Sequence, residues 1–368
     1  SGAAPAPCTT LALRPEPEAE GEPGGAGLQN LGNSCYANAC LRALHATTAL
    51  RRLLLEPEEP PLTLPEKRPL RTPEVTPRLR EAVALLEASR RPAVAVTALK
   101  AAVREPYRGR AQQDAAEFLL YLLDTLEDEA DVGGSKAGAK AKLDAVFGGV
   151  VRTECECFRC RAVSRSTTAM NGAIEVNVPD DARPARKNED RPPEAAVEKP
   201  PSLEALIRDQ AFRTEVLQGD EAYWCDCCGR KVERAEKTGV LQTPPVHLIV
   251  SLSRFRYDAA ARTRRKLETR VDCPMLLTLP GGHAYALYAV VVHAGASPHH
   301  GHYYCYARDA DAARDLSAPP EWRLFDDRTV RAVDARRVAA HAASGSPYLL
   351  FYARLEGPPP PPPPPPPD

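Results

Sequence analysis

The stretch that decides the fold is GLQNLGNSCYANACLRAL, residues 27–44. It begins with turn-forming Gly and Asn residues and changes at Cys35 to the spacing of an amphipathic helix. Ser34 or Asn33 is the expected N-cap, which places Cys35 in the first helical turn. The unpaired backbone N–H groups and the dipole of a helix favour an anion there, a setting that lowers the pKa of a thiol. Cys35 is therefore either a nucleophile or a small buried residue at a helix start.

Composition limits the function classes that the chain can belong to. The 368 residues are 43% hydrophobic, enough for one large or two smaller domains. The 48 Lys and Arg residues against 49 Asp and Glu residues argue against bulk nucleic-acid binding. We recognise neither a transmembrane run nor a signal peptide, so no membrane partner is expected. In that setting, 11 cysteines favour metal binding or catalysis over disulfides and indicate an intracellular location, cytoplasmic or nuclear.

The pattern along the chain predicts a helical first half and a β-rich second half. We expect residues 1–26 to be disordered, a first helix from Cys35 to about Leu55, and further helical spacing over 78–103. Residues 131–142 are rich in Gly, Ala and Lys and are expected to form a loop. Short strand candidates separated by turn residues occupy 246–354. This distribution predicts an α+β fold.

The segment 109–130 is expected to be a helix with two different faces. The apolar face comprises Ala116, Leu119, Leu120, Leu123 and Leu126. The other face carries Asp114 and Glu117. These carboxylates are either ordinary acidic residues near a helix N-terminus or a binding ledge for a cationic partner. The spacing favours neither interpretation.

Two Cys-x-x-Cys pairs are the most specific local signal in the chain. The pairs are Cys157 with Cys160 and Cys225 with Cys228. Four thiolates on two tight turns form a closed tetrahedral zinc site, which is structural because no position stays open for substrate. Cys155 and Cys227 are neighbours that can replace a pair member. A charged, Pro-rich insert at 181–201, expected to be mobile, lengthens the segment between the pairs.

A second set of residues contains what a cysteine protease needs. A thiolate requires a histidine that transfers protons and an Asn or Asp that orients this histidine. His302 follows Gly301 at the start of a strand candidate, and Gly301 permits close approach of a partner chain. Asp326 and Asp327 end another strand candidate, EWRLFDD. Each of these residues has an ordinary interpretation alone, but together with Cys35 they form a candidate triad.

These motifs resemble those of the ubiquitin-specific protease family of deubiquitinases. GLQNLGNSCYANACLRAL is similar to its cysteine box, and QQDAAEFLLYLLD is similar to its Gln-Asp box. VVHAGASPHHGHYYCYAR, WRLFDDRTV and YLLFYAR resemble successive parts of its histidine box, and the cysteine pairs match its zinc-bearing fingers. The resemblance runs from Gly27 to Arg354. RTRRKLETRVDCPMLLTLP also looks like the branch that contains ubiquitin carboxyl-terminal hydrolases 35 and 38.

The resemblance implies a papain-like catalytic domain over 27–355, with a helical thumb, a β-rich palm and zinc-bearing fingers at about 147–240. By match, Cys35 is the nucleophile and His302 the general base and acid. The histidine is oriented by Asp326, beside which Asp327 is a supporting carboxylate.

The resemblance also assigns residues around this triad. Asn30 matches the side chain that stabilises the oxyanion together with backbone N–H groups near the cysteine. Asp114 and Glu117 match positions that contact the basic tail of ubiquitin. Gly301 and Tyr303 complete the expected substrate-binding set.

The function implied is hydrolysis of the bond after the C-terminal glycine of ubiquitin through a thioester. The alternatives are a catalytically silent ubiquitin-binding scaffold and a protease for a ubiquitin-like modifier. The proline run that dominates residues 356–368 predicts a polyproline II tail, which is either a ligand for SH3, WW or profilin-type domains or a spacer.

Overall fold

The computed structural model describes seven ranges of the chain, which are 24–56, 75–131, 136–171, 173–180, 200–258, 262–297 and 300–355. Three predictions fall almost entirely outside these ranges and stay predictions. They concern the disordered segment 1–26, the mobile insert 181–201 and the polyproline tail 356–368. Within the described ranges, no helix combines the length and the apolar character that a membrane span requires.

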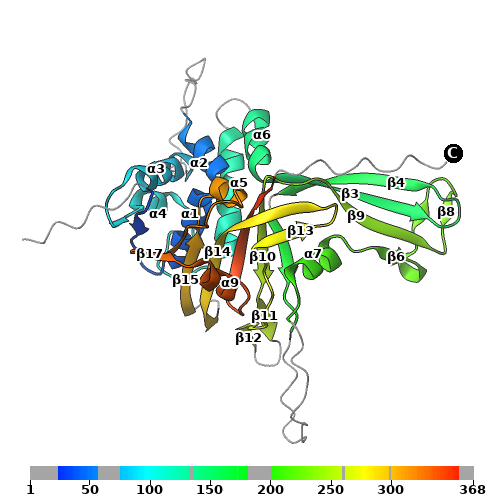
Figure 1. Cartoon of the computed structure of the whole chain (residues 1–368). Coiled ribbons are helices and arrows are strands. Elements are labelled where there is room, and N and C mark those ends of the chain that lie inside the picture. The colour runs from blue at the N-terminus through cyan, green and yellow to red at the C-terminus, as the bar shows by residue number, and fades with distance from the viewer. Residues whose placement is uncertain are drawn as a thin grey trace, which may run out of the picture.

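Helices of the first half gather on one side of the molecule (Figure 1). They are α1 (Cys35–Ala46), α2 (Thr48–Leu55), α3 (Val75–Ala88), α4 (Thr97–Ala102), α5 (Ala115–Asp131) and α6 (Lys136–Phe147). Two short strands, β1 (Gly27–Leu28) and β2 (Ala93–Val94), form a parallel pair beside them. This side corresponds to the predicted thumb.

An eight-stranded sheet forms the centre of the molecule and corresponds to the predicted palm. Its strands are β5 (Ala173–Asn177), β10 (His247–Ser253), β13 (Leu276–Leu279), β14 (His283–Ser297), β15 (His300–Ala307), β16 (Trp322–Asp326), β17 (Thr329–Val333) and β18 (Pro347–Arg354). The order is β17-β16-β15-β14-β18-β10-β5, and β13 also pairs with β14. Both faces are covered, which explains why β14 and β18 are continuous apolar runs rather than alternating ones.

The two faces of the sheet bury separate cores. One core packs against α1 and α5. The other packs against α7 (Leu203–Ala211) and α9 (Ala335–Ala342). Three further elements are α8 (Ala310–Arg314) and the hairpin strands β11 (Phe255–Asp258) and β12 (Thr263–Lys266).

The long strands of the predicted fingers project away from the central sheet (Figure 1). They are β3 (Gly148–Cys157), β4 (Val163–Asn171), β9 (Ala235–Thr243) and the shorter β6 (Glu215–Leu217), in the order β4-β3-β9-β6. A small hairpin of β7 (Trp224–Cys225) and β8 (Arg230–Lys231) follows a 3-10 turn at Gly219–Glu221. The predicted range 147–240 is not continuous in space, because β5 and α7 lie within it and pack with the central sheet.

Two helix predictions were wrong in detail. The helix predicted from Cys35 to Leu55 is two helices, because the chain bends at Thr47, which has a ψ of 90°. The Thr47 hydroxyl is hydrogen-bonded to the Ala43 carbonyl at 3.0 Å and to the Tyr288 hydroxyl at 2.8 Å, so the bend is held by the core. The loop predicted over 131–142 is largely the helix α6, since Ala and Lys are good helix formers even beside Gly.

The buried face of α5 is rotated from the predicted one. Its core-facing residues are Ala115, Phe118, Leu119, Tyr121, Leu122 and Leu126. Leu120, assigned to the apolar face, is 44% exposed. The segment FLLYLL has no polar residue to mark the solvent side, so spacing alone does not fix the rotation of the helix.

Candidate active site and four-cysteine centre

The loop before α1 presents Cys35 at the start of the helix. Ser34 occupies the N-cap position, but its side chain makes no capping hydrogen bond. Its hydroxyl accepts instead from the Leu31 N–H at 2.8 Å, which fixes the loop. Asn33 has a φ of 48°, a left-handed conformation that Asn tolerates better than most residues. Cys35 lies in the first helical turn as predicted, and it is buried.

His302 meets Asp326 because their strands are neighbours, and it meets Cys35 because α1 packs against β15. β15 and β16 pair antiparallel, and the Nε2 atom of His302 lies 2.5 Å from the Oδ1 atom of Asp326. The other ring nitrogen, Nδ1, is left for the thiol. A hydrogen bond with Cys35, and secondly the bond with Asp326, outweigh burial and raise the pKa of His302 to about 9. The imidazole is therefore protonated at neutral pH.

The amide of Asn30 is held in one orientation. Its Oδ1 atom accepts from the backbone N–H groups of Gly32 at 3.0 Å and Ser34 at 3.1 Å. Its Nδ2 atom donates to Oδ2 of Asp327 at 2.9 Å. Asp327 has a φ of 48° in the turn between β16 and β17, and its Oδ1 atom accepts from Asn38 Nδ2 at 2.7 Å. Asp327 thus contacts the Asn30 loop through one carboxylate oxygen and α1 through the other.

The two acidic residues of α5 differ in their surroundings. Asp114 is half-buried and caps the helix, accepting from the N–H groups of Ala116 at 2.7 Å and Glu117 at 3.1 Å. Its second oxygen accepts from the Tyr348 hydroxyl. Glu117 is exposed. Asp114 therefore caps α5 and binds Tyr348, whereas the exposed carboxylate of Glu117 is more accessible to a partner.

The expectation that Tyr303 contacts substrate stays a prediction, but the structure gives its side chain no access to the surface. Its side chain is fully buried, with its ring 4.6 Å from His293 and 6.0 Å from Tyr348. Successive side chains of a strand point to opposite faces, so His302 and Tyr303 cannot both face the same site.

Gly301 is explained by the protein's own backbone rather than by a partner chain. Its φ is 154°, and an added Cβ would lie 2.6 Å from both the Ala294 carbonyl oxygen and Nε2 of His293. Only glycine fits this approach of β14 to β15. The residue is exposed on its other side, beside His302.

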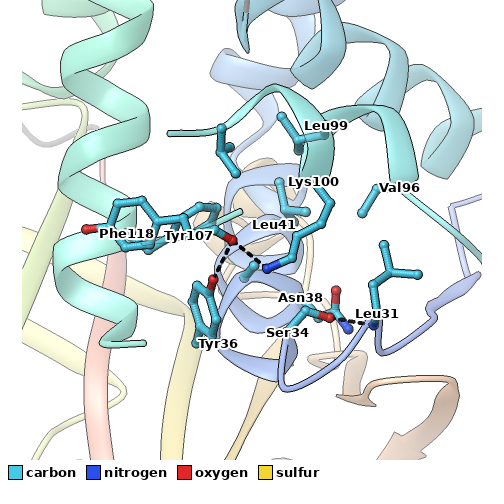
Figure 2. Close-up of a pocket in the computed structure, with 12 residues that line it drawn as sticks. Leu31, Ser34, Tyr36, Asn38, Leu41, Val96, Leu99, Lys100, Tyr107 and Phe118 are labelled. Atoms are coloured by element: carbon cyan, nitrogen blue, oxygen red, sulfur yellow. Dashed lines mark hydrogen bonds between the residues drawn. The ribbon is translucent and has the colours of Figure 1, made fainter. Parts of the chain in front are cut away.

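A small apolar pocket lies behind the Cys35 loop and was not anticipated from the sequence (Figure 2). Leu31 and Ser34 of the loop line one side of it. On the other side, Nζ of Lys100 donates to the carbonyls of Tyr107 at 2.5 Å and Gly109 at 2.8 Å. The Tyr36 hydroxyl, one residue after Cys35, donates to the same Tyr107 carbonyl at 3.2 Å. These bonds tie α1 and α4 to the segment that contains Tyr107 and Gly109.

The four predicted cysteine ligands converge at the end of the fingers. The sulfur atoms of Cys157, Cys160, Cys225 and Cys228 all lie within 4.8 Å of one another. Two of the separations are 3.9 Å, between Cys157 and Cys228, and 3.6 Å, between Cys160 and Cys225. A zinc–sulfur distance of about 2.3 Å in a tetrahedron requires sulfur atoms about 3.8 Å apart.

The donor set therefore fits a four-thiolate metal site. The two alternatives for its members, Cys155 and Cys227, are not part of the cluster. Every cysteine in the described ranges is a free thiol rather than half of a disulfide.

Comparison with known proteins agrees with the motifs. Residues 26–352 match the family model "Ubiquitin carboxyl-terminal hydrolase". Human ubiquitin carboxyl-terminal hydrolase 17 is 28% identical over 341 residues, covering 89% of this chain and 56% of that protein. Human ubiquitin carboxyl-terminal hydrolase 42 is 26% identical over 339 residues, covering 90% of this chain and 23% of that protein. The chain thus spans about half the length of hydrolase 17 and less of hydrolase 42.

The fold has a solved counterpart in the SAGA Ubp8/Sgf11/Sus1/Sgf73 DUB module bound to ubiquitin aldehyde. The TM-score is 0.68 at 18% identity, covering 92% of this chain and 71% of that one. This likeness supports the thumb, palm and fingers architecture. The narrower assignment to the branch of hydrolases 35 and 38 stays a prediction. Since the family model spans most of the sequence, the chain belongs to the ubiquitin carboxyl-terminal hydrolase family.

Proposed function

We propose that the chain is a thiol-dependent deubiquitinase that hydrolyses the isopeptide or peptide bond after the C-terminal glycine of ubiquitin. The observation that carries the proposal is the contact of His302 with both Cys35 and Asp326 in a chain of this family. The human relatives named above are ubiquitin carboxyl-terminal hydrolases. A scaffold without catalysis would not need the three groups in hydrogen-bond contact.

The chemistry follows from the positions of the three side chains. The thiolate Sγ of Cys35, whose proton resides on His302, attacks the carbonyl carbon of the terminal glycine, forming a sulfur–carbon bond while the carbonyl oxygen takes up the negative charge. The protonated His302 then gives its proton to the leaving amine, and the carbon–nitrogen bond breaks. Neutral His302 next removes a proton from water, whose oxygen displaces the sulfur and releases the carboxylate. Asp326 keeps the ring oriented and stabilises its protonated form.

Asn30 supplies the remaining electrostatic element of the proposal. One Nδ2 hydrogen is used by Asp327, and the second is available to the oxygen on which charge develops. A side-chain donor of this kind contributes about 3 kcal/mol in the transition state. The exposed Glu117 and the half-buried Asp114 would face the basic tail of ubiquitin, and the exposed backbone of Gly301 would lie beside this tail.

We further propose that Cys157, Cys160, Cys225 and Cys228 hold zinc. Such a closed thiolate site has no open position for substrate, so it stabilises the fingers and takes no part in the reaction. The sulfur separations given above support this assignment.

The direct test is reaction with ubiquitin that carries an electrophile in place of its C-terminal carboxylate. We expect wild-type protein and a Cys227→Ser control to form a covalent adduct, because Cys227 is exposed but remote from the triad. Cys35→Ala should form none. Failure of folded wild-type protein to react, or adduct formation by Cys35→Ala, would contradict the proposal. Parallel probes built on ubiquitin-like modifiers identify the preferred modifier.

Two other proposals rest on the sequence and on cysteine chemistry. We propose that the proline run after residue 357 binds SH3, WW or profilin-type domains. We also propose an intracellular location, cytoplasmic or nuclear, which the free thiols support.

A further inference from the structure

Asn38 connects the helix that carries the nucleophile to the turn that follows the triad aspartate. It lies one helical turn after Cys35 and is 4% exposed. Its Nδ2 atom donates to Oδ1 of Asp327 at 2.7 Å and to the Gln29 carbonyl at 3.3 Å. Both hydrogens of this amide therefore point at acceptors that belong to the surroundings of Asn30.

Asp327 joins the two amides. Its two carboxylate oxygens are divided between two donors, Oδ1 with Asn38 and Oδ2 with Asn30. The direction of Oδ2 is thus fixed by the bond that Oδ1 makes on the opposite side. The backbone of Asp327 is held as well, since its carbonyl accepts from the Leu28 N–H at 2.8 Å.

The orientation of the Asn30 amide depends on this arrangement. Oδ1 of Asn30 already accepts two backbone N–H groups, so the amide cannot be reversed without losing both bonds. Rotation about the side chain is then limited by the bond from Nδ2 to Asp327. The second Nδ2 hydrogen is the one that the proposed function assigns to the oxyanion, and its direction follows from the first.

We infer that Asn38 is a positioning residue for catalysis, acting through Asp327 to aim the Asn30 amide at the oxyanion. The inference rests on the proposed function, because it assigns Asn38 a part in transition-state stabilisation. Asn38 touches neither the substrate nor the reacting atoms. Its removal should lower the rate of the chemical step and leave the binding of ubiquitin in place.

The test compares Asn38→Ala with a matched control that loses a buried hydrogen bond elsewhere. Thr48→Val is suitable, since the Thr48 hydroxyl donates to Asp309 at 2.9 Å and is 3% exposed. We expect Asn38→Ala to lower kcat by about 10- to 100-fold with KM little changed. It should weaken inhibition by ubiquitin aldehyde, whose thiol adduct places an oxygen in the oxyanion position, but not the binding of unmodified ubiquitin. Thr48→Val should leave these values unchanged.

A second set of variants separates positioning from general support of the fold. Asn38→Asp places a carboxylate against Asp327, so its kcat should be lower than that of Asn38→Ala. The combination Asn38→Asp with Asp327→Asn restores a donor and an acceptor between the two positions, and the new amide oxygen still accepts from Asn30. This double variant should be at least tenfold faster than Asn38→Asp alone, at equal affinity for unmodified ubiquitin.

The outcomes distinguish this inference from the proposed function. An active wild type with a fully active Asn38→Ala variant overturns only the role of Asn38. The role of Asn38 is also overturned if Asn38→Ala loses as much affinity for unmodified ubiquitin as for ubiquitin aldehyde. It is likewise overturned if the kcat of the double variant is no higher than that of Asn38→Asp. Either result would indicate a purely structural residue. A wild type that is inert toward ubiquitin aldehyde overturns the proposed function, and this inference with it.

Discussion

Replacing Asp326 by Asn probes the charge that holds the catalytic histidine in its protonated form. The pKa of His302 rises from an ordinary 6.5 to about 9, first through the hydrogen bond with Cys35 and secondly through Asp326. Asn keeps a hydrogen-bonding oxygen next to the ring but removes the negative charge. Because an opposite charge at this distance shifts a pKa by about one to three, the variant should bring the pKa of His302 down to about 8 or below.

The pH dependence of kcat/KM reports this change in the free enzyme. Above the pKa of His302 the ring has no proton to give to the leaving amine, so the rate with an isopeptide-linked substrate should fall. We expect the alkaline midpoint near pH 9 in the wild type and at about pH 8 or below in Asp326→Asn. Asp209→Asn is the control, since this exposed carboxylate pairs with Arg208 on α7. An alkaline midpoint that is unchanged or higher in Asp326→Asn would refute the reasoning.

Three further expectations concern stability. Treatment with a chelator, or the substitution Cys160→Ser, should lower the melting temperature. Either change should also reduce the bound zinc found by elemental analysis, which should be about one per chain in the untreated wild type. An unchanged thermal unfolding transition would contradict a structural metal. Burial lowers the pKa of His247 to about 3 and that of His293 to about 4. The unfolded chain therefore binds more protons below about pH 6.5, so the free energy of unfolding in urea should decrease from pH 7 to pH 5. Leu122→Ala, at a fully buried position of α5, should cost about 2–5 kcal/mol in the same assay, against a small effect for the exposed Leu120→Ala.

The sequence contained most of the information about where chemistry is placed. Short motifs around Cys35, His302 and Asp326 predicted three residues that the structure brings into contact over more than 250 positions of chain. The cysteine pairs predicted the four-sulfur cluster equally well, because two tight turns fix the ligands locally. Residue type and spacing are enough when the chemistry demands particular atoms.

What the sequence did not reveal depends on contacts between distant elements. The bend at Thr47 is held partly by Tyr288 on β14, and nothing in the local pattern indicates this partner. The burial of Tyr303 follows from the face that β15 turns to the core, which spacing next to a catalytic histidine does not determine. Asn38 was missed for the same reason, since its partner Asp327 lies 289 residues away.

The way the fingers are rooted in the central sheet has a mechanical consequence. β4 leads into β5 after one residue and β9 leads into β10 after three, so two of the long strands continue into neighbouring strands at one edge of the sheet. His302 and Asp326 belong to β15 and β16 near the opposite edge, and β14 and β18 lie between. A force on the cysteine end of the fingers is therefore transmitted to the central sheet at the edge formed by β5 and β10. A displacement of the fingers therefore reaches the triad only through the intervening strands β14 and β18.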